Sequence, residues 1–278
     1  MTLLARQPWL NSIEKRLRKP VALFLDFDGT LASIVPRPDD AWLLPSTRDL
    51  LKLLSRRVPV AIVSGRSLRD LRSRIGLKGV TYVGNHGLEV AGQNLRFKMK
   101  DAAHWRAFLI KIGRQLDEDL GKIPGILLEN KGYTLSVHYR LAGGQARQKA
   151  RRLFAKRLQP YQVRNLVRLR RGKAVWEVRP PVLWDKGTAV RWVLKQPGFR
   201  GRWPLFIGDD ETDKDVFRAI WNYGIGIFVG ASQENGTAHY RLKDPIKVHG
   251  FLKWLLRQLM HREVRIYGQG SYLRNGGR

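Results

Sequence analysis

Two carboxylates stand two residues apart at Asp26 and Asp28, after the apolar run 21–25 and just before Gly29. Side chains two residues apart in an extended segment point to the same side, and glycine lets the chain turn sharply after them. One carboxylate could attack phosphorus and carry a phosphoryl group. The other could protonate the departing oxygen and later accept a proton from water. The pair therefore suggests phosphoryl transfer, although D-x-D is also common in ordinary loops.

A second acidic cluster follows the apolar run 205–207 and contains Asp209, Asp210 and Asp213. Carboxylates this close repel one another unless a cation neutralises them. The chain has no cysteine, so a metal must use oxygen or imidazole ligands, and Mg²⁺ suits carboxylates together with phosphate oxygens. The alternative is that Asp210 or Asp213 only caps the helix that follows.

Hydrogen-bond donors for a phosphoryl group stand at Ser64, Gly65 and Lys186. Ser64 and Gly65 follow the apolar run 59–63, and Lys186 begins a helical pattern. A phosphoryl oxygen could accept hydrogen bonds from the hydroxyl, from backbone N–H groups near a helix start and from the ammonium. In a chain with 52 Lys and Arg residues, one such lysine by itself says little.

Elements that could position these groups are visible in the apolar pattern. The runs 21–25, 59–63 and 205–207 do not alternate with polar residues, which is typical of strands buried on both faces of a parallel sheet. Helical patterns lie between them, with Ser46 and Ser67 as predicted N-caps. Alternating strands and helices predict a doubly wound parallel α/β sheet, in which ligands bind beyond the carboxyl ends of the strands.

The middle of the chain has a different pattern. Apolar and polar residues alternate over 133–140 and 174–178, as in half-buried strands, and amphipathic helical patterns precede both segments. We therefore predict an inserted α+β domain over 100–182, with 1–99 and 183–278 forming one core domain. Within the core, the basic, Gly-rich end of the chain, 261–278, has little periodicity, and we expect it to be mobile.

The order of the motifs supports the chemistry more strongly than any one of them. D-x-D-G-T, a strand-end Ser, a Lys at a helix start and G-D-D-x-x-D together resemble the haloacid dehalogenase-type phosphatases, which have a Rossmann-like core. The resemblance implies that Asp26 is the nucleophile and Asp28 the general acid/base. It implies that the phosphoryl group is held by Thr30, Ser64, Gly65 and Lys186. It also implies Mg²⁺ bound by Asp26, the main-chain carbonyl of Asp28 and Asp209, with Asp210 and Asp213 assisting.

Further stretches are similar to trehalose-6-phosphate phosphatases: 84–87 with Glu89, 129–132, 136–140 and 176–180. With the core motifs, the resemblance covers about 21–255. It implies a phosphatase of trehalose biosynthesis that acts on trehalose 6-phosphate and closes the inserted domain as a cap. The implied substrate-binding residues are Arg66, Asn85, His86, Glu129, Lys131 and Glu177. Two alternatives stay open, namely another sugar phosphate as substrate, and Glu129, Lys131 and Glu177 as solvated residues on an open sheet face.

The net charge of +29 is unusual for such an enzyme, and 130–176 contains thirteen Lys or Arg residues and no acid. This charge could serve a nucleic-acid partner or only form a solvated basic face, which we favour because no nucleic-acid-binding motif accompanies it. No apolar run is long enough to span a membrane. The N-terminus lacks the pattern of a secretory signal. We expect a cytoplasmic monomer whose ligand is a small sugar phosphate.

Overall fold

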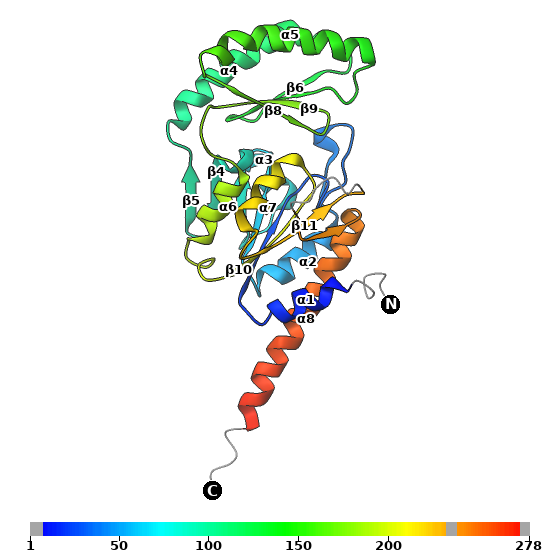
Figure 1. The fold of residues 1–278 in the computed structure, drawn as a ribbon, viewed down its shortest axis with the longest axis vertical. Helices are drawn as coiled ribbons and strands as arrows, with labels where there is room; N and C mark the ends of the chain where they lie inside the picture. Colours follow the sequence, from blue (N-terminus) through cyan, green and yellow to red (C-terminus); the bar gives the residue numbers. More distant parts are fainter. Residues whose placement is uncertain (1–7, 232–237, 273–278) are drawn as a thin grey trace.

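A computed structural model describes residues 8–231 and 238–272 (Figure 1). The larger sheet has eight strands in the order β12-β11-β10-β1-β2-β3-β4-β5. Pairing is parallel from β12 to β3 and antiparallel from β3 to β5. The strands are β1 (Val21–Leu25), β2 (Val60–Val63), β3 (Thr81–Gly84), β4 (Glu89–Gly92), β5 (Leu95–Lys98), β10 (Trp203–Gly208), β11 (Ile225–Val229) and β12 (Tyr240–Leu242).

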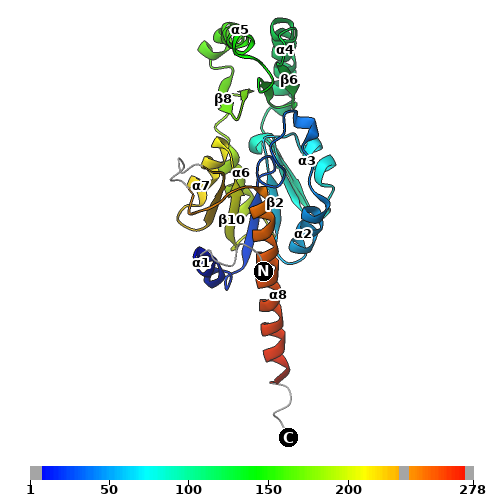
Figure 2. The same cartoon turned by 90° about the vertical axis from the view of Figure 1, so that its right-hand side faces the viewer.

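Helices cover both faces of this sheet, which confirms the doubly wound α/β fold. Figure 2 shows α2 and α3 on one side and α6 and α7 on the other. The helices are α1 (Trp9–Arg16), α2 (Pro45–Ser55), α3 (Leu68–Ile75), α6 (Lys186–Leu194), α7 (Lys214–Ile220) and α8 (Pro245–Tyr272). The described residues of this part also include the short 3₁₀ turns η1 (Pro38–Asp40), η2 (Asn85–Gly87) and η3 (Glu211–Asp213).

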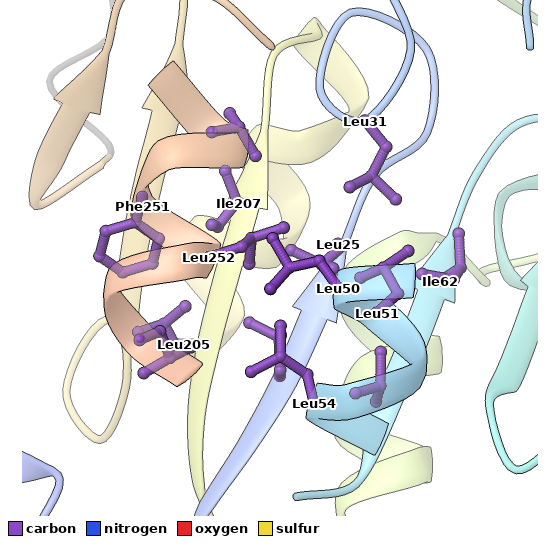
Figure 3. Packing of buried hydrophobic residues seen from close by; sticks show 14 of the residues in the cluster. Leu25, Leu31, Leu50, Leu51, Leu54, Ile62, Leu205, Ile207, Phe251 and Leu252 are labelled. Atoms are coloured by element: carbon purple, nitrogen blue, oxygen red, sulfur yellow. The ribbon is translucent and has the colours of Figure 1, made fainter. Parts of the chain in front are cut away.

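The unbroken apolar runs are explained by burial on two sides. Leu23 and Leu25 of β1 belong to a hydrophobic cluster shared with α2 and α8, whereas Phe24 belongs to a second cluster shared with α6 and α7. Figure 3 shows the first of these, with Leu51 of α2 and Phe251 of α8 packed over the strands. Neither face of β1 meets water, so there is no polar alternation to see. Truncating a buried leucine here would cost about 2–5 kcal/mol.

A second, antiparallel sheet with strand order β6-β7-β9-β8 lies between β5 and α6 in the chain. We call residues 102–179 the insert. Its elements are α4 (Ala102–Leu120), β6 (Leu127–Asn130), β7 (Leu135–His138), α5 (Gly144–Val163), β8 (Arg168–Gly172) and β9 (Val175–Arg179). Both helices lie on the side of the small sheet that faces away from the large one (Figure 1). The insert has a hydrophobic cluster of its own, around Leu116, Val137 and Trp176. The division at 100 and 182 stays a prediction.

The residues at which α2 and α3 begin test the two predicted N-caps. Ser67 caps α3, because its side chain accepts a hydrogen bond from the Asp70 N–H. The prediction for Ser46 is wrong, since α2 begins one residue earlier, at Pro45, and has no side-chain cap. Proline suits the first turn of a helix, where its missing N–H leaves no donor unsatisfied.

The C-terminal helix α8 continues to Tyr272. The segment 261–278, which we expected to be mobile, is therefore helical in its first part, and 273–278 lies outside the described residues. Among the helices of the described part of the chain, none is both long enough and apolar enough to cross a bilayer.

Candidate active site

Polar side chains follow four neighbouring strands of the large sheet at its carboxyl edge. Asp209, Asp26, Ser64 and Asn85 come directly after β10, β1, β2 and β3, which pair in this order and in parallel. These strand ends meet at one edge, which is where open α/β sheets bind ligands. The pocket there is lined by both parts of the molecule, including Asp26, Asp28, Ser64, Gly65, Arg66, His86, Lys186, Asp209 and Asp210 of the core and Glu129, Lys131, His138, Arg140, Lys173 and Glu177 of the insert.

Asp26 is buried beside the ammonium group of Lys186. The Lys186 Nζ donates to Asp26 Oδ1 at 2.9 Å and to Asp213 Oδ1 at 2.7 Å. Burial raises the pKa of Asp26 well above its ordinary value, against the pull of Lys186. Burial opposes the charge of Lys186 too, but Asp213 and Asp26 outweigh it and raise the pKa of Lys186. Lys186 is therefore a permanent cation between two buried carboxyl groups.

Three buried carboxylates form a candidate cation site. Asp26, Asp209 and Asp213 each offer an oxygen atom, and these atoms lie within 4.8 Å of one another. Burial raises the pKa of Asp209 to about 6, against the opposing charge of Lys173. Buried carboxylates at this separation favour a hard divalent ion, which takes oxygen ligands. The donor set thus fits a cation such as Mg²⁺.

Asp213 also has the capping role that the sequence left open. Its Oδ2 accepts from the backbone N–H groups of Asp209 and Asp210, both at 2.9 Å, and Asp210 and Asp213 form a reciprocal capping box at η3. Both oxygen atoms of Asp213 are engaged, since Oδ1 accepts from Lys186. Asp213 therefore fixes the loop that carries Asp209 as well as adding negative charge.

Gly29 lets the Asp26 loop approach Asp209. Its φ is +80°, and a Cβ atom there would lie 2.1 Å from Asp209 Oδ2. Any side chain would strain the backbone and also displace that carboxylate. Thr30, predicted to bind phosphate, is fully buried and donates from its hydroxyl to Asp209 Oδ1 at 3.3 Å. In this arrangement Thr30 orients the carboxylate.

Arg66 holds the second carboxylate of the motif. Its Nε and Nη2 donate to the two oxygen atoms of Asp28, both at 2.7 Å, and Nη1 donates to Asp70 at 2.7 Å. These bonds outweigh burial and raise the pKa of Arg66. A bidentate pair of this kind fixes direction as well as charge. Arg66, for which the sequence predicts a substrate-binding role, lines the pocket, and its guanidinium orients Asp28.

Ser64 and Gly65 form the turn after β2. The Ser64 hydroxyl accepts from the Arg66 N–H at 3.2 Å, so its proton is free to point elsewhere. A Cβ atom on Gly65 would lie 2.4 Å from the His86 ring, so glycine admits that ring to the pocket. His86 has a φ of 57°, in the left-handed region that non-glycine residues rarely adopt.

The insert contributes one face of its sheet to the pocket. Glu129 and Glu177 flank Ser136 in register, so all three lie on the same face. The Lys131 Nζ lies 3.7 Å from Glu129 and 3.9 Å from Glu177. Glu177 is 5% exposed and the Lys131 side chain 9%. The alternative of an open, solvated face is therefore wrong for these two residues, because the core covers it.

Burial and neighbouring charges together set the protonation of these groups. His86 Nε2 lies 2.7 Å from Glu177 Oε1, and Arg179 also contacts Glu177. Burial, assisted by Arg179, lowers the pKa of His86 to about 3, so its ring is neutral and donates to the carboxylate. Burial opposes the charge of Glu177, but His86 and Arg179 hold its pKa well below the ordinary value. Glu129 behaves alike, because Lys131 and His138 outweigh burial and lower its pKa to about 2.

Asn85 joins the core to the insert. It is fully buried, and its Nδ2 donates to Glu89 at 2.6 Å and to the Lys131 carbonyl at 3.1 Å, while the Thr134 hydroxyl donates to its Oδ1 at 2.9 Å. Asn85, predicted to bind substrate, does not line the pocket among the described residues. Its contacts instead set the position of Lys131.

Lys173 is a site residue that the sequence did not reveal. It stands in the turn between β8 and β9, and its ammonium group contacts Asp209 Oδ2. His138 and Arg140 also line the pocket, and His138 Nε2 lies 2.9 Å from Glu129. The only signal for Lys173 was its place just before the alternating segment that carries Glu177.

Comparisons with known proteins agree on one family. A family model described as trehalose-phosphatase matches residues 24–246. The trehalose-phosphate phosphatase of Mycobacterium tuberculosis (strain ATCC 25618 / H37Rv) is 37% identical over 255 residues, covering 89% of this chain and 64% of that protein. Trehalose-phosphate phosphatase B of Arabidopsis thaliana is 33% identical over 252 residues, covering 86% of this chain and 67% of that protein. The chain therefore spans just under two thirds of the length of the mycobacterial relative.

Solved structures with a similar fold include proteins named as trehalose-6-phosphate phosphatases or as related to them. The C-terminal domain of the C. albicans trehalose-6-phosphate phosphatase is 26% identical, with a TM-score of 0.75 and coverage of 92% of this chain and 98% of that one. A trehalose-6-phosphate phosphatase related protein also has a TM-score of 0.75, at 24% identity, covering 87% of this chain and 99% of that one.

Proposed function

The chain belongs to the trehalose-phosphatase family, and we propose that it hydrolyses trehalose 6-phosphate to trehalose and inorganic phosphate. One observation carries this proposal: Asp26, Lys186 and Asp209 of the core line the same pocket as Glu129, Lys131 and Glu177 of the insert. The first group has the charges that phosphoryl transfer needs. The second group offers hydrogen-bonding partners for sugar hydroxyls.

In the first step, an oxygen of the Asp26 carboxylate attacks phosphorus and the bond between phosphorus and the sugar oxygen breaks. A proton from Asp28 passes to that oxygen, so trehalose leaves as an alcohol. In the second step, water attacks phosphorus, its proton passes to Asp28, and the bond to Asp26 breaks. Phosphate is released and both carboxyl groups return to their first state. Arg66, which binds both oxygen atoms of Asp28, stabilises the negative charge that Asp28 carries between the two steps.

Mg²⁺ would be held by Asp26, Asp209 and the main-chain carbonyl of Asp28, with Asp210 and Asp213 assisting. A bound divalent cation stabilises negative charge on phosphoryl oxygens. The support for this is the group of three carboxylates within 4.8 Å. Lys186 and Ser64 would bind the remaining phosphoryl oxygens, because the ammonium lies beside Asp26 and the hydroxyl proton is free.

The insert would act as a cap that recognises the sugar. Glu177 and Glu129 are ionised acceptors and Lys131 is a donor on one sheet face, at the pocket. Charged partners of this kind discriminate among hydroxyl patterns, because a wrong sugar leaves a buried charge unpaired. Closure over the substrate would also exclude water from the reacting groups.

The test is a phosphate-release assay over a panel of phosphorylated sugars, with Mg²⁺ and with a chelator. We expect the highest kcat/KM with trehalose 6-phosphate, and no turnover after chelation. A clear preference for sucrose phosphate or a glucosylglycerol phosphate would favour the alternative substrate class. Turnover that survives chelation would contradict the cation assignment.

A further inference from the structure

Lys173 reaches the core from a well-defined position in the insert. Gly172 and Val175 pair across the β8–β9 hairpin, so Lys173 and Ala174 form a two-residue turn. The Ala174 carbonyl accepts from the Tyr139 N–H at 3.1 Å, and the Lys173 carbonyl accepts from Arg140 at 2.9 Å. The turn is therefore fixed to the rest of the insert, and a movement of Lys173 away from the core moves the hairpin with it.

The ammonium of Lys173 contacts one of the least exposed carboxylates of the pocket. The Asp209 side chain is 3% exposed, and the Lys173 side chain is 44% exposed. Asp209 Oδ1 accepts from Thr30, and Oδ2 contacts Lys173. Within the described part of the chain, the other contact between titratable side chains of the insert and the core is His86 with Glu177, in which the histidine is neutral. Among the described residues, Lys173 and Asp209 are thus the contact between insert and core in which both side chains are charged.

A divalent cation and Lys173 need the same group. Asp209 is the carboxylate proposed above to bind the cation, and a positive charge beside it repels a second one. The cation would meet competition at Asp26 and Asp213 as well, because both carboxylates contact the ammonium of Lys186. A cation that binds Asp209 must therefore weaken or replace the Lys173 contact.

We propose that Lys173 is a positioning residue whose ammonium competes with the divalent cation for Asp209, so that cation binding weakens the hold of the β8–β9 hairpin on the core. This inference rests on the cation site of the proposed function. The insert is held against the sheet edge by Lys173 before the cation binds. Once the cation is bound, the hairpin is released and the ammonium can turn toward an anion in the pocket.

The first test measures cation affinity without substrate, by titration calorimetry with MgCl₂. Lys173→Gln removes the competing charge, and we expect its Kd for Mg²⁺ to fall on the order of fivefold, because a half-exposed ion pair contributes up to about that factor. Lys173→Arg keeps the charge and should bind as the wild type does. Arg171→Gln removes an exposed base from the same hairpin and serves as the matched control.

Several results would overturn the proposal. One is a Kd for Lys173→Gln that equals or exceeds that of the wild type. Another is a change that Arg171→Gln reproduces, which would indicate a general field effect. Binding heat that persists in Asp209→Asn would place the cation elsewhere. Absence of binding heat in both the wild type and Lys173→Gln would mean that there is no cation for Lys173 to compete with.

The second test follows the hairpin by hydrogen exchange of the amides in β8 and β9. Mg²⁺ should speed exchange in the wild type, whereas Lys173→Gln should exchange faster from the outset and respond little. Unchanged exchange in the wild type would contradict the link to the hairpin. Neither test uses turnover, so the two proposals can fail separately. If no phosphorylated sugar is hydrolysed but Lys173→Gln binds Mg²⁺ more tightly than the wild type, the proposed function is rejected and this inference stands.

Discussion

The core half and the insert half of the pocket are built in different ways. In the core, Asp26, Ser64 and Asp209 follow buried strands, and parallel pairing alone brings their positions together. In the insert, Glu129 and Glu177 lie on one face of a sheet that reaches the pocket only because the insert packs over the core. The comparison indicates that the reactive groups are placed by strand ends and sheet pairing within the core, whereas the recognition groups depend on contacts between the insert and the core. Changes in the core should therefore affect every substrate, and changes in the insert only some.

The largest effect is expected at Asp26. Asp26→Asn keeps the shape of the side chain and removes the nucleophile, so turnover should fall by about 10⁴-fold or more on all substrates. Lys186 keeps its contact with Asp213, and we expect the melting temperature to stay close to that of the wild type. The two measurements are a phosphate-release assay and thermal unfolding. Substantial residual turnover in a folded variant would reject the nucleophile.

Lys186 should be the core residue with the greatest effect on stability. Lys186→Ala leaves Asp26 and Asp213 buried without their shared cation, and breaking a buried pair in this way costs about 3–5 kcal/mol. The matched control is Lys214→Ala, which breaks a pair with the exposed Glu211 and should cost about 0–1 kcal/mol. Urea unfolding of both variants measures the difference. Equal costs would mean that burial does not set the strength of the Lys186 contacts.

Lys131 tests the recognition half. Lys131→Ala removes a donor between Glu129 and Glu177, and kcat/KM for trehalose 6-phosphate should fall by about 10–100-fold. Turnover of p-nitrophenyl phosphate, which has no sugar, should change by less than about threefold. Equal losses on both substrates would show that Lys131 serves the chemistry, and the division between core and insert would then fail.

The core half of the pocket could be predicted from the sequence more fully than the insert half. Asp26, Ser64 and Asp209 were predictable because each follows an apolar run of a buried strand. The Ser46 cap was predicted wrongly, since the neighbouring Pro45 is the better first residue of a helix. Lys173 was not predictable, because one base among many gains its meaning only when the hairpin reaches Asp209. The burial of Glu177 likewise depends on the core covering the insert.

A smaller effect, on the pH dependence of stability, is expected at His86, which joins the core to Glu177 of the insert. Its pKa of about 3 lies below the ordinary 6.5, so the unfolded chain binds more protons than the folded protein between these values. Stability therefore falls as pH drops through this window. Between pH 6.5 and 5, the wild type should lose about 1–2 kcal/mol more unfolding free energy than His86→Gln. Urea unfolding at both pH values checks this, with the exposed His104→Gln as control. Equal slopes for all three proteins would mean that His86 is not held neutral.

The smallest effect is expected on the outer side of the insert, where Arg151 and Arg152 of α5 are exposed. Their double change to glutamine should alter kcat/KM by less than about twofold, because they lie outside the pocket. We also expect no binding of generic oligonucleotides at about 0.15 M salt, since phosphate contacts without a recognition motif weaken steeply with salt. Binding that persists in the wild type and disappears in the double variant would revive the nucleic-acid alternative.

The covalent step is the central claim, and trapping it is the most direct test. The enzyme is mixed with trehalose 6-phosphate and Mg²⁺, quenched in acid during turnover, digested and analysed by peptide mass spectrometry. We predict a phosphoryl group on Asp26, in a peptide that spans the end of β1. Phosphate release without any phosphorylated peptide, or with the group on another side chain, would contradict the account.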